Sequence, residues 1–330
     1  MQTDQKTFLT RLGSFWVAGT SIIGTLLILM IISLTLIIGK ADSTEKTSLN
    51  SSVLHKGSED QIAVVDISGV IIDEIGSGDP FSLDQSTASV RSLTKIFKEL
   101  ETTENVKAVV LRINSPGGTV VASDELYLSI KRLAEQKLVI AQLNDLAASG
   151  GYYAALGADT IIANRATITG SIGVIAQFPE FTELFEKIGV EVRTIKSGDL
   201  KDIGTFDRAM TDQEKEILQS IIDDAYQQFI DAVVAGRGIS RDEAITLADG
   251  RIYSGSQALE VNLIDAVGTY ESALDLAKSE ANLDDPSIVE YNQGSFFSML
   301  FSSIQGVSPT AELVKVVPNS TFGVYYMLAL

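Results

Sequence analysis

The chain has 330 residues, enough for one large domain or two small ones. Its formal net charge is −18, which argues against nucleic acid as a partner, because phosphate binding needs clustered lysine and arginine. It contains no cysteine, which excludes disulfides, thiolate catalysis and cysteine-ligated zinc. The single histidine, His55, lies in a polar stretch, so neither a Ser-His-Asp triad nor a histidine-ligated metal site is expected.

An apolar run near the amino terminus indicates a membrane anchor. Residues 15–38 carry no charged side chain and would form a helix about 36 Å long, enough to span a bilayer. A cleaved signal peptide is the alternative, but its apolar region is only about 7 to 15 residues long. The run therefore predicts a retained transmembrane helix, residues 15–39, after a cytoplasmic amino terminus, residues 1–14.

Positive charges on both sides of this run bear on its orientation. Lys6 and Arg11 favour a cytoplasmic amino terminus, whereas Lys40 and Lys46 on the other side weaken that bias. We expect a single-pass protein of the cell membrane, in contact with lipid, whose folded part lies outside the cytoplasm.

The rest of the chain divides by composition into three regions. Serine, threonine, lysine and glutamate dominate residues 40–61, which are expected to form a polar tether. Residues 62–281 are expected to fold as one domain, without a tandem repeat. Residues 282–330 form a carboxy-terminal extension that is apolar in places, and we expect it to lie on the membrane or across a neighbouring subunit's cleft.

Strand and helix patterns alternate through the central region. Apolar, β-branched runs predict strands at 62–71, 108–113, 138–143, 160–163, 169–175 and 190–195. Apolar residues at helical spacing predict helices at 88–101, 126–134, 181–188, 211–235, 241–248, 256–261 and 270–281. This alternation predicts an α/β fold with a mainly parallel sheet and crossover helices. Functional groups in such folds gather at the carboxyl ends of the strands.

Ser149 lies at one such strand end, between a buried run and an alanine-rich helix. This places its hydroxyl beside the free backbone N–H groups of a helix amino terminus, where negative charge is stabilised. Two interpretations are open from these residues alone. Serine is a preferred helix cap, so Ser149 could only cap the helix, or it could act as a nucleophile.

A nucleophilic serine here needs a base other than histidine. A lysine serves only when neutral, and lowering the pKa of a lysine from about 10.4 to about 7 costs near 5 kcal/mol, which requires burial. Lys196 and Lys201 both follow the predicted strand 190–195, and spacing does not choose between them. Gly118 and Gly150 follow strand ends and could donate backbone N–H groups to an oxyanion, although a Pro-Gly-Gly sequence is also common in plain turns.

Four motifs carry a resemblance to a known family. They are SPGG at 115–118, ASGGYY at 148–153, TGSIG at 169–173 and SGDLKD at 197–202. Their order and spacing resemble the signal peptide peptidase A family, which comprises membrane-anchored Ser-Lys peptidases of the Clp-protease/crotonase fold. The likeness extends over about residues 62–281, in the short form of the family with one catalytic unit.

The resemblance implies a role for each residue of the site. Ser149 would be the nucleophile and Lys201 the general base. Ser171 would hold the lysine amine by a hydrogen bond, and the amides of Gly118 and Gly150 would bind the oxyanion. In short members of the family, the serine and lysine of one site come from neighbouring subunits of a ring-like homo-oligomer. The substrates would be remnant signal peptides or other short apolar peptides, and no cofactor or metal would be needed.

Three alternatives remain beside this interpretation. A related membrane quality-control peptidase would keep the same residues and act on other substrates. A crotonase-like acyl-CoA enzyme would share the oxyanion-binding amides without needing the lysine. In an inactive membrane scaffold, Ser149 would only cap its helix.

Overall fold

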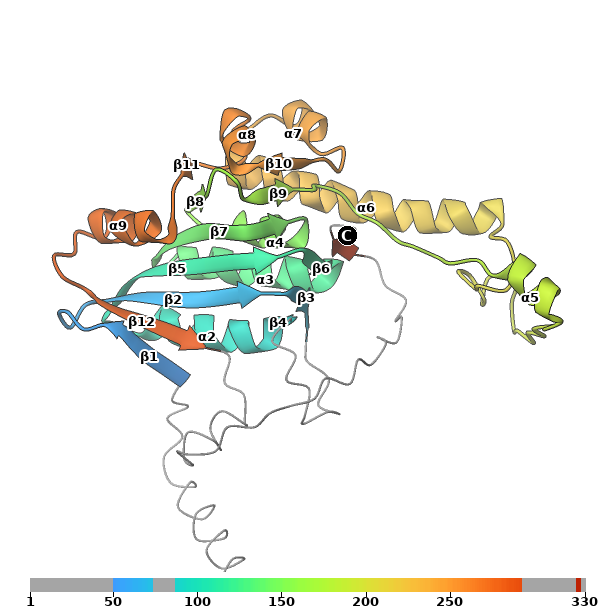
Figure 1. Ribbon diagram of the computed structural model, residues 1–330, viewed down its shortest axis with the longest axis horizontal. Coiled ribbons are helices and arrows are strands. Elements are labelled where there is room, and N and C mark those ends of the chain that lie inside the picture. Colours follow the sequence, from blue (N-terminus) through green and yellow to red (C-terminus); the bar gives the residue numbers. More distant parts are fainter. Residues whose placement is uncertain (1–49, 74–86, 293–324, 328–330) are drawn as a thin grey trace, which may run out of the picture. The chain divides into compact units, whose positions relative to one another are not determined.

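The computed structural model describes residues 50–73, 87–292 and 325–327, all within one compact unit, residues 49–330 (Figure 1). The predicted cytoplasmic amino terminus and transmembrane helix lie outside these residues. Among the helices of the described ranges, none is both long and apolar enough to span a bilayer.

The apolar runs form the larger of two sheets. Its central strands β12, β2, β5, β7, β8 and β11 lie in that order and are mutually parallel, while β1 pairs antiparallel with β12 and β10 with β9. The predicted α/β architecture with a mainly parallel sheet is therefore confirmed. The strands are β1 (Asn50–His55), β2 (Gln61–Ser68), β5 (Val106–Ser115), β7 (Leu138–Ala148), β8 (Thr160–Ala163), β9 (Ile168–Gly170), β10 (Ile252–Ser254), β11 (Ala266–Val267) and β12 (Ser287–Asn292).

A smaller sheet of short strands lies beside the carboxyl ends of β2 and β5 (Figure 1). In order it contains β13 (Tyr325–Met327), β6 (Gly117–Thr119), β3 (Val70–Ile72) and β4 (Thr87–Ser89). β6 pairs in parallel with β3 and antiparallel with β13. The strand that carries Gly118 is thus held from both sides.

The described helices lie close to the predicted ones, except that the helix predicted at 126–134 begins earlier, at Val120. They are α2 (Val90–Thr102), α3 (Val120–Ala134), α4 (Gly150–Ala155), α5 (Thr182–Ile188), α6 (Asp212–Arg237), α7 (Arg241–Leu247), α8 (Gly255–Glu260) and α9 (Tyr270–Glu280). α6 begins as its sequence indicates, because Thr211 and Glu214 form a capping box that satisfies free N–H groups of the first turn.

The sheet is buried on both faces. On β5, Val109 and Leu111 point into the core that α2, α3 and α4 cover, whereas Ala108 and Val110 point into the core beneath α9. Successive side chains of a strand face opposite sides, so a strand covered on both faces has to be apolar throughout. This explains why the central strands are continuous β-branched runs and not alternating ones.

Four segments differ from the expectations. The strand predicted at 190–195 is wrong, because these residues are exposed and pair with no strand of the described chain. The predicted strand at 169–175 is shorter, since β9 ends at Gly170. β1 lies in the stretch predicted as a tether and β12 in the predicted extension, so the paired strands continue on both sides of residues 62–281.

Candidate active site

Three neighbouring strands bring the predicted residues around Ser149 together. β5 and β7 pair in parallel with Ser115 opposite Ala147, and β7 pairs with β9 so that Ala148 lies opposite Gly170. The residues that follow these strands therefore meet at one edge of the sheet. Ser149 directly follows Ala148 and Ser171 directly follows Gly170. The Ser149 N–H donates to the Gly170 carbonyl over 2.7 Å.

The Ser149 side chain is buried and has no hydrogen-bond partner within the described chain. Only 1% of the residue is exposed, and its Oγ makes no hydrogen bond there. It occupies the position before the first residue of α4, yet it makes no capping bond to the helix. The interpretation that this serine merely caps its helix is therefore wrong. A buried hydroxyl without a partner is costly, and such groups call for a functional explanation.

The backbone at Ser149 is also strained. Its φ is 52° and its ψ is −118°, a conformation that costs of order 1 to 3 kcal/mol for a residue with a side chain. Strained strand-to-helix turns of this kind are typical of nucleophilic serines that project from a sheet edge. Ser171, with a φ of 52°, shares the left-handed backbone and is 8% exposed.

The glycines predicted to bind an oxyanion lie backbone to backbone. A methyl group on Gly150 would lie 3.0 Å from the Gly118 nitrogen, and one on Gly117 would lie 2.8 Å from the Gly150 nitrogen. Only residues without a Cβ permit this approach. The structure thus brings the Gly118 and Gly150 amides together beside Ser149. Two adjacent amides of this kind can stabilise the negative oxygen of an acyl-transfer intermediate.

Ser123 is a residue of this region that the sequence did not single out. It lies on α3, is fully buried, and its Oγ has no hydrogen-bond partner among the described residues. A methyl group on Gly150 would lie 2.3 Å from this oxygen. Ser123 therefore points at the backbone beside Ser149. No sequence pattern around Ser123 indicates that it lies beside Ser149. Serines on helices are common, and the position of Ser123 depends on how α3 packs against α4.

Lys201 lies on a segment that extends away from this edge. Residues 175–207, which we call the arm, connect β9 to α6, and Figure 1 shows α5 beyond the amino-terminal end of α6. Lys201 is exposed, and its side chain makes no hydrogen bond or ion pair with the described residues. Because the Ser149 Oγ also has no partner there, one chain does not bring the Lys201 amine into hydrogen-bond contact with it.

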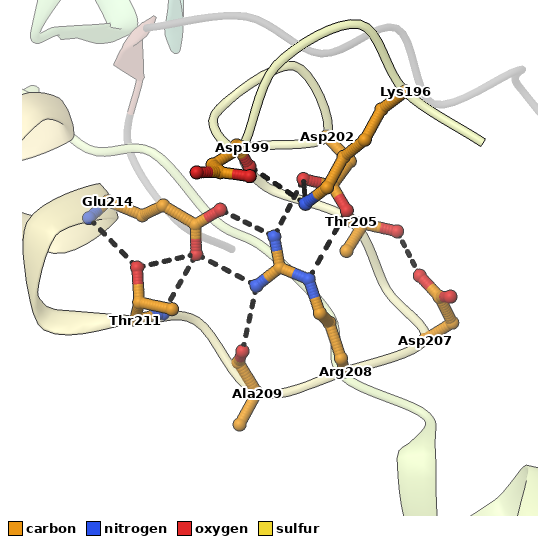
Figure 2. A network of polar contacts seen from close by, with 9 residues as sticks. All are labelled: Lys196, Asp199, Asp202, Thr205, Asp207, Arg208, Ala209, Thr211 and Glu214. Atoms are coloured by element: carbon orange, nitrogen blue, oxygen red, sulfur yellow. Dashed lines mark hydrogen bonds and ion pairs between the residues drawn. The ribbon is translucent and has the colours of Figure 1, made fainter. Parts of the chain in front are cut away.

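An ionic network fixes the loop around Lys201 (Figure 2). The Arg208 guanidinium donates to both oxygens of Asp202, at 2.9 and 3.3 Å, and to both oxygens of Glu214, at 2.6 and 2.9 Å. Glu214 belongs to the capping box of α6 and is buried. Arg208 therefore ties the residue next to Lys201 to the first turn of a long helix.

The charges in this network neutralise one another. Hydrogen bonds from Arg208 and then Lys196 hold the pKa of the Asp202 carboxyl well below its usual range. The Arg208 guanidinium, followed by the Thr211 backbone N–H, lowers the pKa of Glu214 to about 2. The carboxylate adjacent to Lys201 in sequence is thus already paired with two cations.

The same network separates the two candidate lysines. The Lys196 amine donates to the Asp202 carboxylate over 2.7 Å and to the Asp199 carbonyl over 2.8 Å (Figure 2). Two of its three N–H donors are thus engaged within the loop. Lys201 has no such partner among the described residues, so its amine is available to another surface.

The remaining candidates for metal or proton chemistry lie elsewhere. His55 is exposed on β1, where its Nε2 lies 3.0 Å from the Asp285 carboxylate. Within the described ranges, no group of three histidine, aspartate or glutamate side chains is placed to hold a metal ion.

Sequence comparisons align the chain with peptidases. The profile of peptidase family S49 matches residues 131–284. A protein of Methanocaldococcus jannaschii, provisionally named protease MJ0651, is 38% identical over 275 residues, which cover 82% of this chain and 88% of that protein. The chain belongs to peptidase family S49.

Two further relatives of this S49 chain carry more specific names. A protein of Enterococcus faecium, provisionally named signal peptide peptidase SppA, is 36% identical over 292 residues, covering 84% of this chain and 83% of the relative. The Serine protease SPPA, chloroplastic, of Arabidopsis thaliana is 36% identical over 265 residues, covering 78% of this chain and 39% of that protein. The resemblance to the signal peptide peptidase A family is confirmed, and the chain is a serine peptidase.

Among solved structures, a ClpP1 point mutant from Listeria monocytogenes aligns with a TM-score of 0.42 and 19% identity, over 64% of this S49 chain and 94% of that chain. Membership of a peptidase family favours the peptidase interpretation over the acyl-CoA enzyme considered above.

Proposed function

We propose that this S49 peptidase is a membrane-anchored endopeptidase that uses Ser149 as nucleophile and Lys201 as general base. The observation that carries the proposal is the buried Ser149 hydroxyl, which has no hydrogen-bond partner among the described residues and is held on a strained turn beside the Gly118 and Gly150 amides. A site of this kind lacks only a base.

In the proposed reaction, the neutral Lys201 amine takes the proton of the Ser149 hydroxyl while Oγ attacks the peptide carbonyl carbon. The Gly118 and Gly150 amides donate to the resulting oxyanion. When the C–N bond breaks, the Lys201 ammonium gives its proton to the leaving amine. Water then attacks the acyl-enzyme, Lys201 takes a proton from that water, and the proton returns to Ser149 as the acid product leaves. Ser171 would hold the amine in place between these steps.

We propose that the two halves of each site come from neighbouring subunits of a homo-oligomer. A lysine amine becomes a base when it is shielded from water, and Lys201 is exposed in the single chain. The arm that carries it also exposes apolar side chains, which indicates a surface that another subunit covers. They are Ile175, Phe181, Leu184, Ile188, Val190, Val192, Ile195 and Phe206.

The proposed substrates are remnant signal peptides or other short apolar peptides, and the proposed location is the membrane. The apolar run at residues 15–38 supports the anchor. The name of the Enterococcus faecium relative supports the substrate class. A membrane peptidase that degrades other substrates would use the same residues. Mapping the products from synthetic signal peptides against those from misfolded membrane proteins separates the two.

A serine-reactive acylating probe tests the site. The full-length protein should be labelled at Ser149, and the label should be lost in both Ser149→Ala and Lys201→Ala. Lys196→Ala is the matched control, because this lysine lies in the same loop but its amine is already engaged, and it should keep the label. Labelling that persists in Lys201→Ala and disappears in Lys196→Ala would assign the base to the other lysine.

A further inference from the structure

A polar cavity lies beside the carboxyl half of β7, the strand that leads to Ser149. It is bordered by β7, by the residues between β8 and β9, and by the first residues of α9, and we call it the β7–α9 cavity. Its volume is about 310 Å³, which is in the range of small-ligand sites. Asp145 on its wall lies four residues before Ser149, roughly 13 Å along an extended strand. The proposed reaction uses none of the residues that line the cavity.

One hydroxyl on the cavity wall lacks a partner. The Tyr270 oxygen is buried and makes no hydrogen bond with the residues that the structure describes. The ring is held in place, because the Arg112 guanidinium lies 5.1 Å from its centroid and is itself paired with Asp66 and Glu290. A buried hydroxyl without a partner is costly. Water or a ligand in the cavity would supply the missing hydrogen bond.

Two acceptor groups of the wall are also open. Gln142 is only 4% exposed, and its amide nitrogen donates to the Leu143 carbonyl over 2.8 Å, which leaves Oε1 without a partner in the described chain. The Asp145 carboxylate makes no ion pair or hydrogen bond with the described residues. An open carboxylate and an open amide oxygen on one wall suit a cation that donates several hydrogen bonds. A primary ammonium group is such a cation.

The open donors of the wall are uncharged. The Asn164 Oδ1 accepts from the Ala166 N–H over 3.0 Å, so the side-chain amide of Asn164 keeps its two N–H donors. The Tyr270 hydroxyl is the other free donor. Among the described residues that line the cavity, none is a lysine, arginine or histidine. The donors therefore suit a neutral carbonyl oxygen better than a carboxylate, which would lie near Asp145 without an opposite charge.

We propose that the β7–α9 cavity binds the free amino terminus of a short peptide. The ammonium group donates to the Asp145 carboxylate and to the Gln142 Oε1, and the first peptide carbonyl accepts from the Tyr270 hydroxyl and the Asn164 amide. Hydrolysis of a peptide bond creates a free amino terminus on the leaving product. The ligand thus belongs to the class of molecules that an S49 peptidase releases, and its binding does not depend on the roles proposed for Ser149 and Lys201.

Titration calorimetry with three forms of one peptide tests the chemistry of recognition. The protein is the full-length Ser149→Ala variant, so that the ligand is not consumed, and the ligands are trialanine, its N-acetyl form and its carboxy-terminal amide. Trialanine and the amide should bind equally. The acetylated form should bind roughly 100-fold more weakly, because it has lost the charge and two of the three donors. Equal binding of the acetylated form, loss of binding on amidation, or no binding of any form would overturn the proposal.

Tyr270→Phe tests the cavity itself, because it removes only the hydroxyl. The affinity for trialanine should fall by roughly 3- to 10-fold, as one hydrogen bond predicts. The melting temperature should stay the same or rise, since the hydroxyl has no partner in the described chain. Tyr253→Phe is the matched control. The Tyr253 hydroxyl donates to the Leu247 carbonyl over 3.0 Å, so this variant should lose melting temperature and keep its affinity. Unchanged affinity in Tyr270→Phe would mean that only water meets this hydroxyl, and would overturn the proposal.

Asp145→Asn tests the contact with the ammonium group. The affinity for trialanine should fall by roughly 10- to 100-fold, as expected for a hydrogen bond between charged groups. Asp224→Asn makes the same change at an exposed carboxylate of α6 outside the cavity and should leave the affinity unchanged. Binding that neither Asp145→Asn nor Tyr270→Phe weakens would place the peptide elsewhere, including at the candidate active site, and would overturn the proposal.

The outcomes also separate this inference from the proposed function. If trialanine binds as described but the acylating probe does not label Ser149, the cavity stands and the proposed function fails. If the probe labels Ser149 and trialanine does not bind, the proposed function stands and the cavity assignment fails.

Discussion

The turn at Ser149 and the arm at Lys201 differ in how completely a single chain builds them. Ser149 is 1% exposed and fixed by paired strands, and the glycines beside it lie backbone to backbone. On the arm, α5 buries none of its residues and Ile195 is fully exposed. The half of the candidate site around Ser149 is therefore ordered within the single chain. The arm, in contrast, exposes Lys201 and its apolar side chains to solvent.

This difference indicates that, in the proposed mechanism, one chain supplies the Ser149 half of a site and a neighbouring chain supplies Lys201. At Ser149, a strained backbone and a hydroxyl without a hydrogen-bond partner in the described chain are tolerated because the paired strands around the residue fix its conformation. As a base, Lys201 would need shielding that the described part of its own chain does not supply, and the bonds from Arg208 that hold the Lys201 loop do not involve Ser149. If so, a substitution at Ser149 affects the site of its own chain, whereas a substitution at Lys201 affects the site of the neighbouring chain.

The largest expected effect is that of Ser149→Ala. Hydrolysis of peptides should fall by roughly 10⁴-fold or more, since nucleophile removal leaves only binding and oxyanion stabilisation. The melting temperature should stay the same or rise slightly, because the lost hydroxyl is buried without a partner in the described chain. Peptide kcat/KM and thermal unfolding measure the two effects.

Ser129→Ala is the matched control for this change. Ser129 is also a buried serine, but its hydroxyl lies 3.2 Å from that of Thr94 and accepts from the Arg132 guanidinium over 3.4 Å. This variant should keep its activity and lose a few degrees of melting temperature, roughly the value of one or two hydrogen bonds in a domain of this size. A Ser149→Ala protein that stays active would refute the nucleophile assignment.

Mixing two inactive variants sharpens the comparison further. Ser149→Ala and Lys201→Ala should each be inactive alone, but together they should recover about a quarter of wild-type activity, since random assembly leaves one interface in four with both residues intact. To measure this recovery, the two variants are unfolded and refolded together, and the peptidase activity of the mixture is determined. Mixtures that stay inactive, although size measurements show mixed oligomers, would place both residues of a site in one chain.

Features that depend only on neighbouring residues in the sequence were predictable, and the strand, turn and helix around Ser149 are the clearest example. A buried run, small residues and an alanine-rich stretch define a strand, a turn and a helix without any distant contact. The capping box of Thr211 and Glu214 is equally local. What the pattern did not reveal is the torsion angle of Ser149, which keeps its hydroxyl from capping α4 and depends on the pairing of β7 with β9.

The features that were missed all depend on distant partners. Residues 190–195 have the composition of a strand, but a strand needs a neighbour, and the described chain offers none. β1 is an edge strand that forms only by pairing with β12, and β12 in turn pairs on its other side with β2. Tyr326 stood in the sequence as part of an apolar tail, and only the pairing of β13 with β6 places it in the core. Pairing across long separations leaves no periodic signal in either segment.

A substitution on the arm tests whether its apolar side chains meet another subunit. Ile195→Ser should weaken self-association by roughly 10- to 100-fold, as expected for an apolar contact at an interface, and activity should fall at low protein concentration. Analytical ultracentrifugation and the concentration dependence of kcat/KM measure this. Val53→Ser is the control, because Val53 is an exposed apolar residue of β1 outside the arm. Equal association of the two variants would argue against the arm as an interface.

The smallest expected effect concerns Glu214, which anchors the Lys201 loop through Arg208. Because the pKa of Glu214 is about 2 in the folded chain and near 4.5 when unpaired, its contribution to stability is complete above about pH 4.5 and is lost as the pH falls towards 2. Glu214→Gln should therefore lower stability at pH 7 and flatten the acid dependence of unfolding between these values. Activity at pH 7 should fall only a few-fold, since the loop is loosened and no reacting group is removed.

The control for Glu214→Gln lies on the same turn of α6. Glu216 is exposed, so Glu216→Gln makes the same change of charge without touching the Arg208 network, and its acid unfolding curve should follow that of the unmodified chain. Denaturant unfolding at a series of pH values compares the two. Parallel curves for both variants would mean that the Arg208 pairing adds nothing to the stability of the loop, and Lys201 would then have to be positioned by the neighbouring subunit alone.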